Sequence, residues 1–287
     1  MAVRVILVLL SLLATLNASA SAETPDKDAL TLIVMDPLSA PLACDCVKGY
    51  AQRDYEALAA FLKQRLNQDV NVVFAESLTE AMEKSEGKVD LIAGKHSVVL
   101  ADAKESAKSV RPIARLTDLK DSITQTGLIV VRSGDAAKSV ADLKGYRILF
   151  GPADCDEKSK AAIALLKKNG VAIPDKIEVA ASCSEAAVTM VELPAETKVA
   201  AVVSSYATPL LEGCGKVKKG ELRIIGETEP VEFITLFATD SLSGDRLTKV
   251  RSAIDEVGLE ANLLIRLETA SGFQLCNEQT GAVLTAK

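Results

Sequence analysis

Short apolar runs alternate with amphipathic stretches along most of this 287-residue chain. Residues 29–35 read ALTLIVM, a continuous apolar run that is typical of a buried strand. The stretch 53–66 follows, and it repeats large apolar residues at helical spacing. One face of a predicted amphipathic helix therefore carries Tyr55, Leu58, Leu62 and Leu66.

The alternation continues through the first third of the chain. We predict a strand at 70–75, a short helix at 78–87 and a further strand at 89–94. Strands and helices that alternate in this order indicate a mostly parallel sheet with helices on both faces.

A second unit with the same pattern begins after residue 125. Its predicted helix at 157–170 ends in Asn-Gly, a common signal for the end of a helix. The other elements expected here are strands at 146–151, 176–182, 198–206, 221–228 and 231–239, helices at 139–145 and 184–193, and a long helix or helix pair at 244–264. Two similar α/β units indicate two lobes.

The first residues have the layout of a secretory signal peptide. A basic residue, Arg4, precedes an apolar run at 5–16 and a small-residue segment at 17–23. That run of about 12 residues is too short for a hydrocarbon core, which needs roughly 20. We expect residues 1–22 to be a signal peptide and the remainder to be a soluble protein that is periplasmic or otherwise exported.

Composition excludes two classes of ligand. The formal net charge is −6 and no run of Lys or Arg is present, so the chain lacks the basic footprint of a nucleic-acid-binding protein. Aromatic residues make up only 3% and Trp is absent, so stacking of sugar rings has few side chains to use.

Several segments resemble the phosphate/phosphite/phosphonate-type substrate-binding proteins of ABC transporters. They are 54–66, 89–94, 126–151 and 199–206. The most specific is 126–151, a strand, a Ser-Gly turn, a short helix and a strand, which is characteristic of the second lobe in type II periplasmic binding proteins. The resemblance implies an α/β fold of two lobes, each a mainly parallel sheet flanked by helices, with a cleft between them.

The resemblance also implies a domain organisation and partners. Residues 23–127 would form the first part of lobe 1, 128–235 lobe 2, and 236–287 the return to lobe 1, with crossovers near 125–132 and 231–239. Such a protein captures a small molecule or ion by hinge closure and delivers it to an ABC permease. It is expected to be a monomer, to need no cofactor and not to be an enzyme.

Candidate ligand-binding residues follow from the rule that ligands sit at the carboxyl ends of the strands in open α/β sheets. The polar residues expected at those strand ends are Ser39, Lys95, Ser97, Ser204, Ser205 and Tyr206. The resemblance adds the hinge residues Thr124, Gln125 and Thr126. Serine hydroxyls and a lysine suit an anionic ligand, although strand-end serines often only cap loops.

The segment 152–159, PADCDEKS, departs from the family pattern. Phosphonate binders place hydroxyls and backbone N–H groups here, whereas this chain has Asp154, Asp156 and Glu157. Like charge should repel a phosphonate from them. The same acids also suit the beginning of a helix, so Asp156 and Glu157 can be interpreted as helix caps.

Five Cys and His residues fall at the same strand ends, namely Cys44, Cys46, His96, Cys155 and Cys183. Three interpretations stay open. In an exported protein cysteines usually form disulfides, and Cys155 with Cys183 is the best-placed pair. Cys44, Cys46 and His96 could instead bind copper or zinc, or a thiol could act with His96 as a catalytic nucleophile. The metal interpretation favours an alternative function, a periplasmic accessory protein of a redox system or of metal or cofactor handling.

Overall fold

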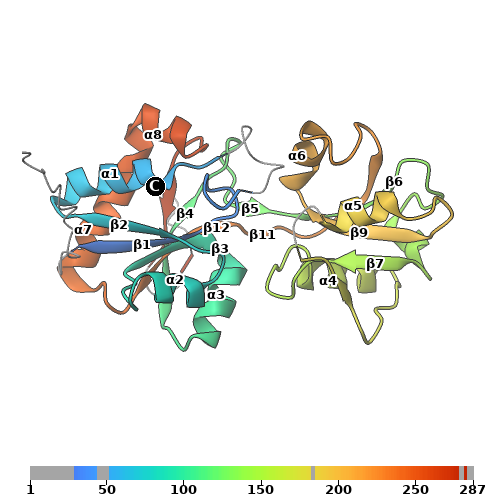
Figure 1. The fold of residues 1–287 in the computed structure, drawn as a ribbon, viewed down its shortest axis with the longest axis horizontal. Coiled ribbons are helices and arrows are strands. Elements are labelled where there is room, and N and C mark those ends of the chain that lie inside the picture. Colours follow the sequence, from blue (N-terminus) through green and yellow to red (C-terminus); the bar gives the residue numbers. More distant parts are fainter. Residues whose placement is uncertain (1–28, 44–51, 182–184, 278–280, 283–287) are drawn as a thin grey trace, which may run out of the picture.

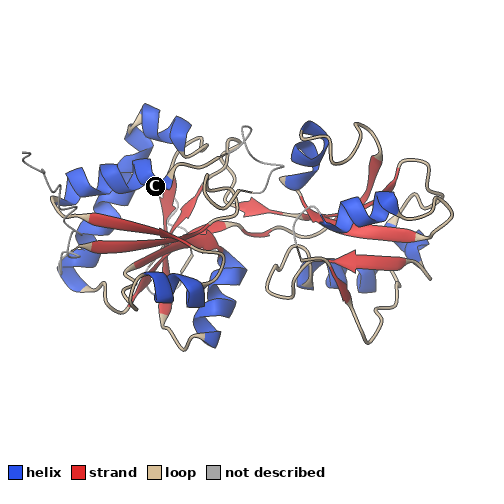
Figure 2. Cartoon of the chain, viewed as in Figure 1, coloured by secondary structure: helices blue, strands red, loops and turns tan. Residues whose placement is uncertain are grey.

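The computed structural model describes residues 29–43, 52–181, 185–277 and 281–282. Figure 1 shows two lobes that lie side by side and are connected by a narrow pair of strands. Each lobe is a sheet with helices against it, as Figure 2 shows. This confirms the predicted two-lobed α/β class. Within these residues no helix is long and apolar enough to cross a membrane.

Lobe 1 contains a six-stranded sheet in the order β13-β4-β12-β3-β1-β2. Its strands are β1 (Leu30–Met35), β2 (Val70–Phe74), β3 (Leu91–Lys95), β4 (Val110–Leu116), β12 (Ile234–Thr239) and β13 (Phe273–Leu275). β1 pairs in parallel with β2 and β3, whereas β12 runs antiparallel to β3 and β4. The sheet is therefore mixed.

Helices cover both faces of this sheet (Figure 1). They are α1 (Tyr55–Leu66), α2 (Leu78–Lys84), α3 (His96–Glu105), α7 (Gly244–Asp255), the 3₁₀ turn η2 (Glu256–Leu259) and α8 (Ala261–Arg266). α1 begins where the Asp54 side chain accepts a hydrogen bond from the Ala57 amide, and it ends at Asn67 in the left-handed conformation. Its predicted apolar face is buried, as Tyr55, Leu58 and Leu62 are inaccessible to solvent.

Lobe 2 contains a five-stranded sheet in the order β10-β6-β9-β7-β8. Its elements are β6 (Gly127–Arg132), η1 (Val140–Leu143), β7 (Arg147–Phe150), α4 (Lys160–Lys168), β8 (Glu178–Val179), α5 (Glu185–Glu192), β9 (Val199–Ser204), α6 (Ala207–Gly213) and β10 (Leu222–Glu227). β7 is parallel to β8 and β9, and β6 is antiparallel to β9 and β10.

Two short strands connect the lobes. β5 (Thr124–Gln125) pairs antiparallel with β11 (Val231–Glu232), with Gln125 opposite Val231. The chain passes from lobe 1 to lobe 2 through β5 and returns through β11, and this pair lies between the lobes in Figure 1. A two-stranded connection with few other contacts is suited to act as a hinge.

Three details of the predicted fold are wrong. The sheets are mixed, not mainly parallel, because the chain enters lobe 2 along β6 and returns to lobe 1 along β12, and both strands run against their neighbours. The strand predicted at 89–94 extends to Lys95, and it is followed directly by a helix that was not predicted, α3. The helix predicted at 157–170 begins only at Lys160, because the preceding residues form tight turns.

Candidate ligand-binding site between the lobes

A buried ion pair joins the two lobes. Lys95, the last residue of β3, contacts the carboxylate of Glu157 through its ammonium group. Ser204, the last residue of β9, donates a hydrogen bond of 2.6 Å to the same carboxylate oxygen, Oε1. The three residues are at most 6% exposed. A cation from lobe 1 and a hydroxyl from lobe 2 therefore converge on one carboxylate.

Both members of this pair are charged. Burial by itself lowers the pKa of Lys95, but the adjacent Glu157 carboxylate more than offsets this and the pKa is raised. Burial likewise tends to raise the pKa of Glu157, and the charge and hydrogen bond of Lys95 together with the Ser204 hydrogen bond lower it overall. Removal of either partner would leave an uncompensated charge in the interior.

Segment 152–159, which we call the acidic turn, carries Glu157 and lies against lobe 1. Ser97, in the first turn of α3, donates a hydrogen bond of 2.5 Å from Oγ to the carbonyl of Asp154. The same oxygen accepts a bond of 3.2 Å from the Asp156 amide. The Asp156 carboxylate pairs with Lys160 at 2.7 Å. Ser97, Asp154 and Asp156 thus meet across the lobes, but they do so largely through the backbone.

Two glycines give the acidic turn its close approach to the lobe 2 sheet. A Cβ atom at Gly127 would lie 1.9 Å from the carbonyl oxygen of Glu157. At Gly151, a Cβ would lie 2.6 Å from the Lys158 Cβ, whose side chain crosses this glycine. Only glycine lets the backbone come this close, so these two positions help to fix Glu157 in place.

Lys158 is a buried cation next to this pair. It is 4% exposed. The charge of Lys95 lowers the pKa of Glu157, and the charge of Lys158 adds to this effect. The other buried charged side chains have named partners, such as Asp36 with Arg53 and Arg115 with Glu232. Within the described residues no ion pair or hydrogen bond is formed by the Lys158 ammonium group.

Several more polar atoms near the hinge and the strand ends are buried without a hydrogen-bond partner in the described part of the chain. They are Oγ of Ser39 after β1, both amide atoms of Gln125 in β5, Oε2 of Glu157 and Oγ1 of Thr208 in α6. Buried polar atoms are nearly always paired with protein, water or a ligand. Their occurrence on both lobes and on the hinge marks this region as the candidate binding site.

Aromatic and charged side chains of the hinge region form a second cluster. Tyr206, which follows β9, stacks on Phe233 with ring centroids 5.4 Å apart. The guanidinium of Arg53 lies over the same Phe233 ring at 5.4 Å. Arg53 and Tyr55 both donate to Oδ2 of Asp36, at 2.9 and 2.7 Å. Tyr206 of lobe 2 is thereby placed on the end of the hinge that returns to lobe 1.

Thr126 and Ser205 form hydrogen bonds within lobe 2. The Ser205 amide donates to the Thr126 carbonyl at 2.9 Å, and the Thr126 amide donates to the Ser205 hydroxyl at 3.3 Å. The Thr126 hydroxyl donates to Glu227 at 2.7 Å. These two predicted ligand-binding residues therefore fasten β6 to the end of β9. Thr124 similarly lies in the hinge pair, opposite Glu232.

His96 is part of a polar network at the hinge. Its Nε2 lies 2.8 Å from the Glu232 carboxylate, and its Nδ1 is hydrogen-bonded to Thr235 at 3.1 Å. Glu232 also contacts Arg115. Burial lowers the pKa of His96, and the Glu232 charge opposes that effect. Both ring nitrogens are engaged, so His96 would have to leave this network before it could bind a metal.

Only some of the cysteines in the predicted site are among the residues that the structure describes. Cys44, Cys46 and Cys183 lie outside the described residues. Cys155 is a free cysteine in the structure, and its predicted disulfide partner is Cys183. The Cys155 side chain is buried within the acidic turn, where burial raises the pKa of its thiol. In the described ranges no cluster of three or more His, Cys, Asp or Glu is arranged to hold a metal ion.

Sequence reasoning missed the residue at the centre of the site. It places Lys95 and Ser204 correctly at strand ends, and the structure brings both onto Glu157, whereas Ser97 lies in the first turn of α3. From the sequence Glu157 is expected either to repel an anionic ligand or to cap a helix, whereas its carboxylate bonds to the opposite lobe. A glutamate just before a helix can cap that helix, but its charge can also neutralise a lysine at the end of a neighbouring strand. The second possibility is the signal that could have identified Glu157.

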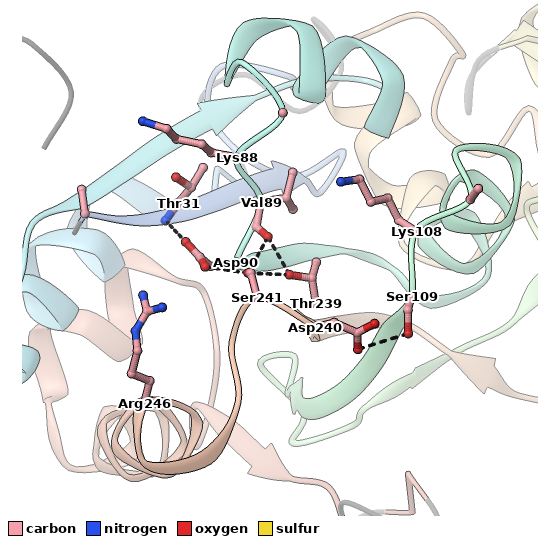
Figure 3. Close-up of a pocket in the computed structure, with 13 residues that line it drawn as sticks. Thr31, Lys88, Val89, Asp90, Lys108, Ser109, Thr239, Asp240, Ser241 and Arg246 are labelled. Atoms are coloured by element: carbon pink, nitrogen blue, oxygen red, sulfur yellow. Dashed lines mark hydrogen bonds between the residues drawn. The ribbon is translucent and has the colours of Figure 1, made fainter. Parts of the chain in front are cut away.

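A cavity lies in lobe 1, away from this site (Figure 3). Its volume is about 500 Å³, and it is bordered by the beginning of β1, the segment before β3 and the end of β12. Lys95, by contrast, is at the far end of β3. Figure 3 shows the Asp90 carboxylate in the cavity wall, where it accepts bonds from the Thr31 amide at 2.9 Å and the Ser241 hydroxyl at 2.7 Å. This carboxylate is already satisfied within the chain.

Solved structures with the same fold come from several bacteria. A Xanthomonas citri protein bound to ATP has a TM-score of 0.64 at 14% identity and covers 86% of this chain and 90% of its own. A binding protein component of an ABC phosphonate transporter from Pseudomonas aeruginosa has a TM-score of 0.64 at 16% identity, with 87% and 82% covered. PhnD1 from Prochlorococcus marinus, in complex with methylphosphonate, has a TM-score of 0.62 at 14% identity, with 88% and 94% covered.

The sequence itself also matches a family. No curated protein sequence matches the chain significantly. The profile of the family described as "ABC transporter, phosphonate, periplasmic substrate-binding protein" matches residues 49–279, most of the chain. With its two lobes, its two-stranded hinge and the polar groups between them, the chain belongs to the phosphonate family of periplasmic substrate-binding proteins of ABC transporters.

Proposed function

We propose that this protein is an exported substrate-binding protein that captures one small polar solute between its lobes and presents it to an ABC permease. The observation that carries the proposal is the set of buried, unpartnered polar atoms on lobe 1, the hinge and lobe 2, within the described residues. A solute that supplied their missing hydrogen bonds would bind both lobes at once, and so would favour the closed arrangement.

Binding and closure are coupled through the hinge. The described part of the chain crosses between the two sheets through β5 and β11, so the lobes can rotate about these strands once the contacts of Lys95 and Ser97 with the acidic turn are broken. Lys95, Glu157 and Ser204 link the lobes on one side of this hinge. A solute that contacts Gln125 and Thr208 would link them further, and a permease could then distinguish the filled protein from the empty one.

The family transports solutes, and we propose no catalytic role. His96 lacks the free ring nitrogen that metal binding or general-base catalysis requires, because Thr235 and Glu232 engage both. Cys155 is buried with a raised thiol pKa, which disfavours a nucleophilic thiolate. The geometry of these residues therefore gives no support to a second function in metal handling or redox chemistry.

A ligand panel with a thermal-shift readout tests the proposal. A solute at 100 times its Kd stabilises the folded state by about 2.7 kcal/mol, which corresponds to a rise in Tm of about 5–11 °C for a protein of this size. Thr208→Val, which removes one unpartnered hydroxyl, should reduce the rise. Thr248→Val, on the exposed face of α7, is the matched control and should not.

The panel should include phosphonates, carboxylates, amino acids, sulfonates and uncharged polar solutes. A thiol count and an elemental analysis of the untagged protein should accompany it. If no solute of any class raises Tm and the protein carries stoichiometric copper or zinc with free thiols, the proposed function is wrong and an accessory role in metal handling replaces it.

A further inference from the structure

The charges buried between the lobes do not match those expected for a phosphonate site. This inference rests on the proposed function, because it concerns the ligand of the same site. A dianionic ligand needs uncompensated cations and hydroxyl donors that converge on its oxygens. Here Lys95 and Ser204 do converge, but on the carboxylate of Glu157. The chain itself supplies the anion that they bind.

With Lys158, the buried cations of the site outnumber the buried anions by one. The buried charged groups of the acidic turn and the facing strand end are Lys95, Glu157 and Lys158, whose exposed fractions are 6%, 0% and 4%. Their formal charges sum to +1. The Lys158 side chain crosses Gly151 at the carboxyl end of β7, the end of the sheet where ligands bind in this class of fold. Within the described residues the Lys158 ammonium group forms no ion pair or hydrogen bond, and it shares the negative charge of Glu157 with Lys95. The positive charge in excess favours an anionic partner from outside the chain.

The remaining carboxylates of the turn limit how negative that partner can be. Asp154 and Asp156 are both partly exposed, and only Asp156 is neutralised, by Lys160. A second negative charge on the ligand would face Glu157 and Asp154 without a further cation to balance it. The unpartnered Oε2 of Glu157 instead favours a hydrogen-bond donor on the ligand.

We propose that the site is specific for a small, singly charged carboxylate that also carries a hydrogen-bond donor, and that it rejects phosphate and phosphonate dianions. Lys158 binds the carboxylate of the ligand. Glu157 neutralises Lys95, excludes the second negative charge and accepts a hydrogen bond from the hydroxyl or amino group of the ligand. The acidic turn is thus the specificity determinant that separates this chain from phosphonate binders.

Isothermal titration calorimetry at about pH 8, where phosphate is largely dianionic, tests the proposal. The probes are 2-hydroxy and 2-amino carboxylates, namely lactate, glycolate, glycine and alanine, with methylphosphonate and inorganic phosphate for comparison. The wild-type protein should bind at least one carboxylate probe, and it should bind both dianions at least about tenfold more weakly.

Two lysine variants separate a ligand contact from a general charge effect. Lys158→Met should weaken carboxylate binding at least about 30-fold, because it removes one partner of a buried charge pair. Lys160→Met removes the same charge two residues away, from a side chain that is 72% exposed, and should change Kd less than about threefold. Glu157→Gln should gain affinity for methylphosphonate, since it removes the competing carboxylate.

The outcomes distinguish this inference from the function on which it rests. Tighter binding of methylphosphonate or phosphate than of every carboxylate by the wild type overturns the inference but supports solute capture. So does binding confined to uncharged solutes, or carboxylate binding that Lys158→Met leaves unchanged. If the wild type binds no solute of any class, the proposed function itself fails.

Discussion

Replacement of Lys95 by Met tests whether the lobes are in contact when no ligand is bound. The substitution keeps the length and apolar stem of the side chain and removes the ammonium group that holds Glu157. Glu157 is inaccessible to solvent and would retain the Ser204 hydrogen bond and the weaker effect of the Lys158 charge on its carboxylate. Loss of one partner from a buried ion pair costs about 3–5 kcal/mol. At about 2–4 °C for each kcal/mol in a protein of this size, Tm should fall by about 6–20 °C.

The assay is thermal unfolding followed by far-UV circular dichroism, with three comparisons. Lys84→Met breaks a surface pair between Lys84 and Glu80, both at least 41% exposed, and should cost about 0.5 kcal/mol or less. The double variant Lys95→Met with Glu157→Met should recover most of the lost stability, because it removes both buried charges. If Lys95→Met is as stable as Lys84→Met, the ion pair is open to water in solution and the lobes do not meet as described.

Three further predictions concern the residues around the site. Gly127→Ala places a Cβ 1.9 Å from a backbone carbonyl oxygen of the acidic turn and should destabilise the protein by about 1–3 kcal/mol. Gly134→Ala is the control, because it has open space around it and should have little effect on stability. Equal Tm values for the two variants would contradict the close packing at Gly127. Burial lowers the pKa of His96, so the unfolded chain binds its proton more readily and the stability from this group is present above its ordinary pKa of about 6.5 and is lost at lower pH. The Tm difference between the wild type and His96→Gln should therefore change as pH falls from about 8 to about 5, and a constant difference would argue against a neutral, buried imidazole. Cys155 is 8% exposed with a thiol pKa raised by burial, so iodoacetamide should modify it in urea but not in the native protein, as peptide mass spectrometry can determine.

Periodicity predicted the elements well because each element buries its own apolar residues. The buried run at 29–35 and the helical spacing of Tyr55, Leu58 and Leu62 both appear in the lobe 1 core. Periodicity says less about strand direction, which depends on where the chain enters a sheet. Two of the antiparallel strands, β6 and β12, follow the hinge, and their direction is set by the passage between lobes.

The site was harder to predict because it depends on contacts between residues far apart in the sequence. Strand-end reasoning found Lys95 and Ser204, since a strand end is a local property. It could not show that Glu157, 62 residues after Lys95, would meet both. The close approach of Gly127 to the acidic turn and the absence of a partner for Lys158 are likewise properties of the folded chain alone, in the part that the structure describes.

The most direct test of the account is a crystal structure of the protein with the carboxylate that binds most tightly. The account predicts one solute between the lobes, with its carboxylate on the Lys158 ammonium group and a donor on Oε2 of Glu157. A solute bound in the lobe 1 cavity beside Asp90, or one that contacts neither Lys158 nor Glu157, would contradict it.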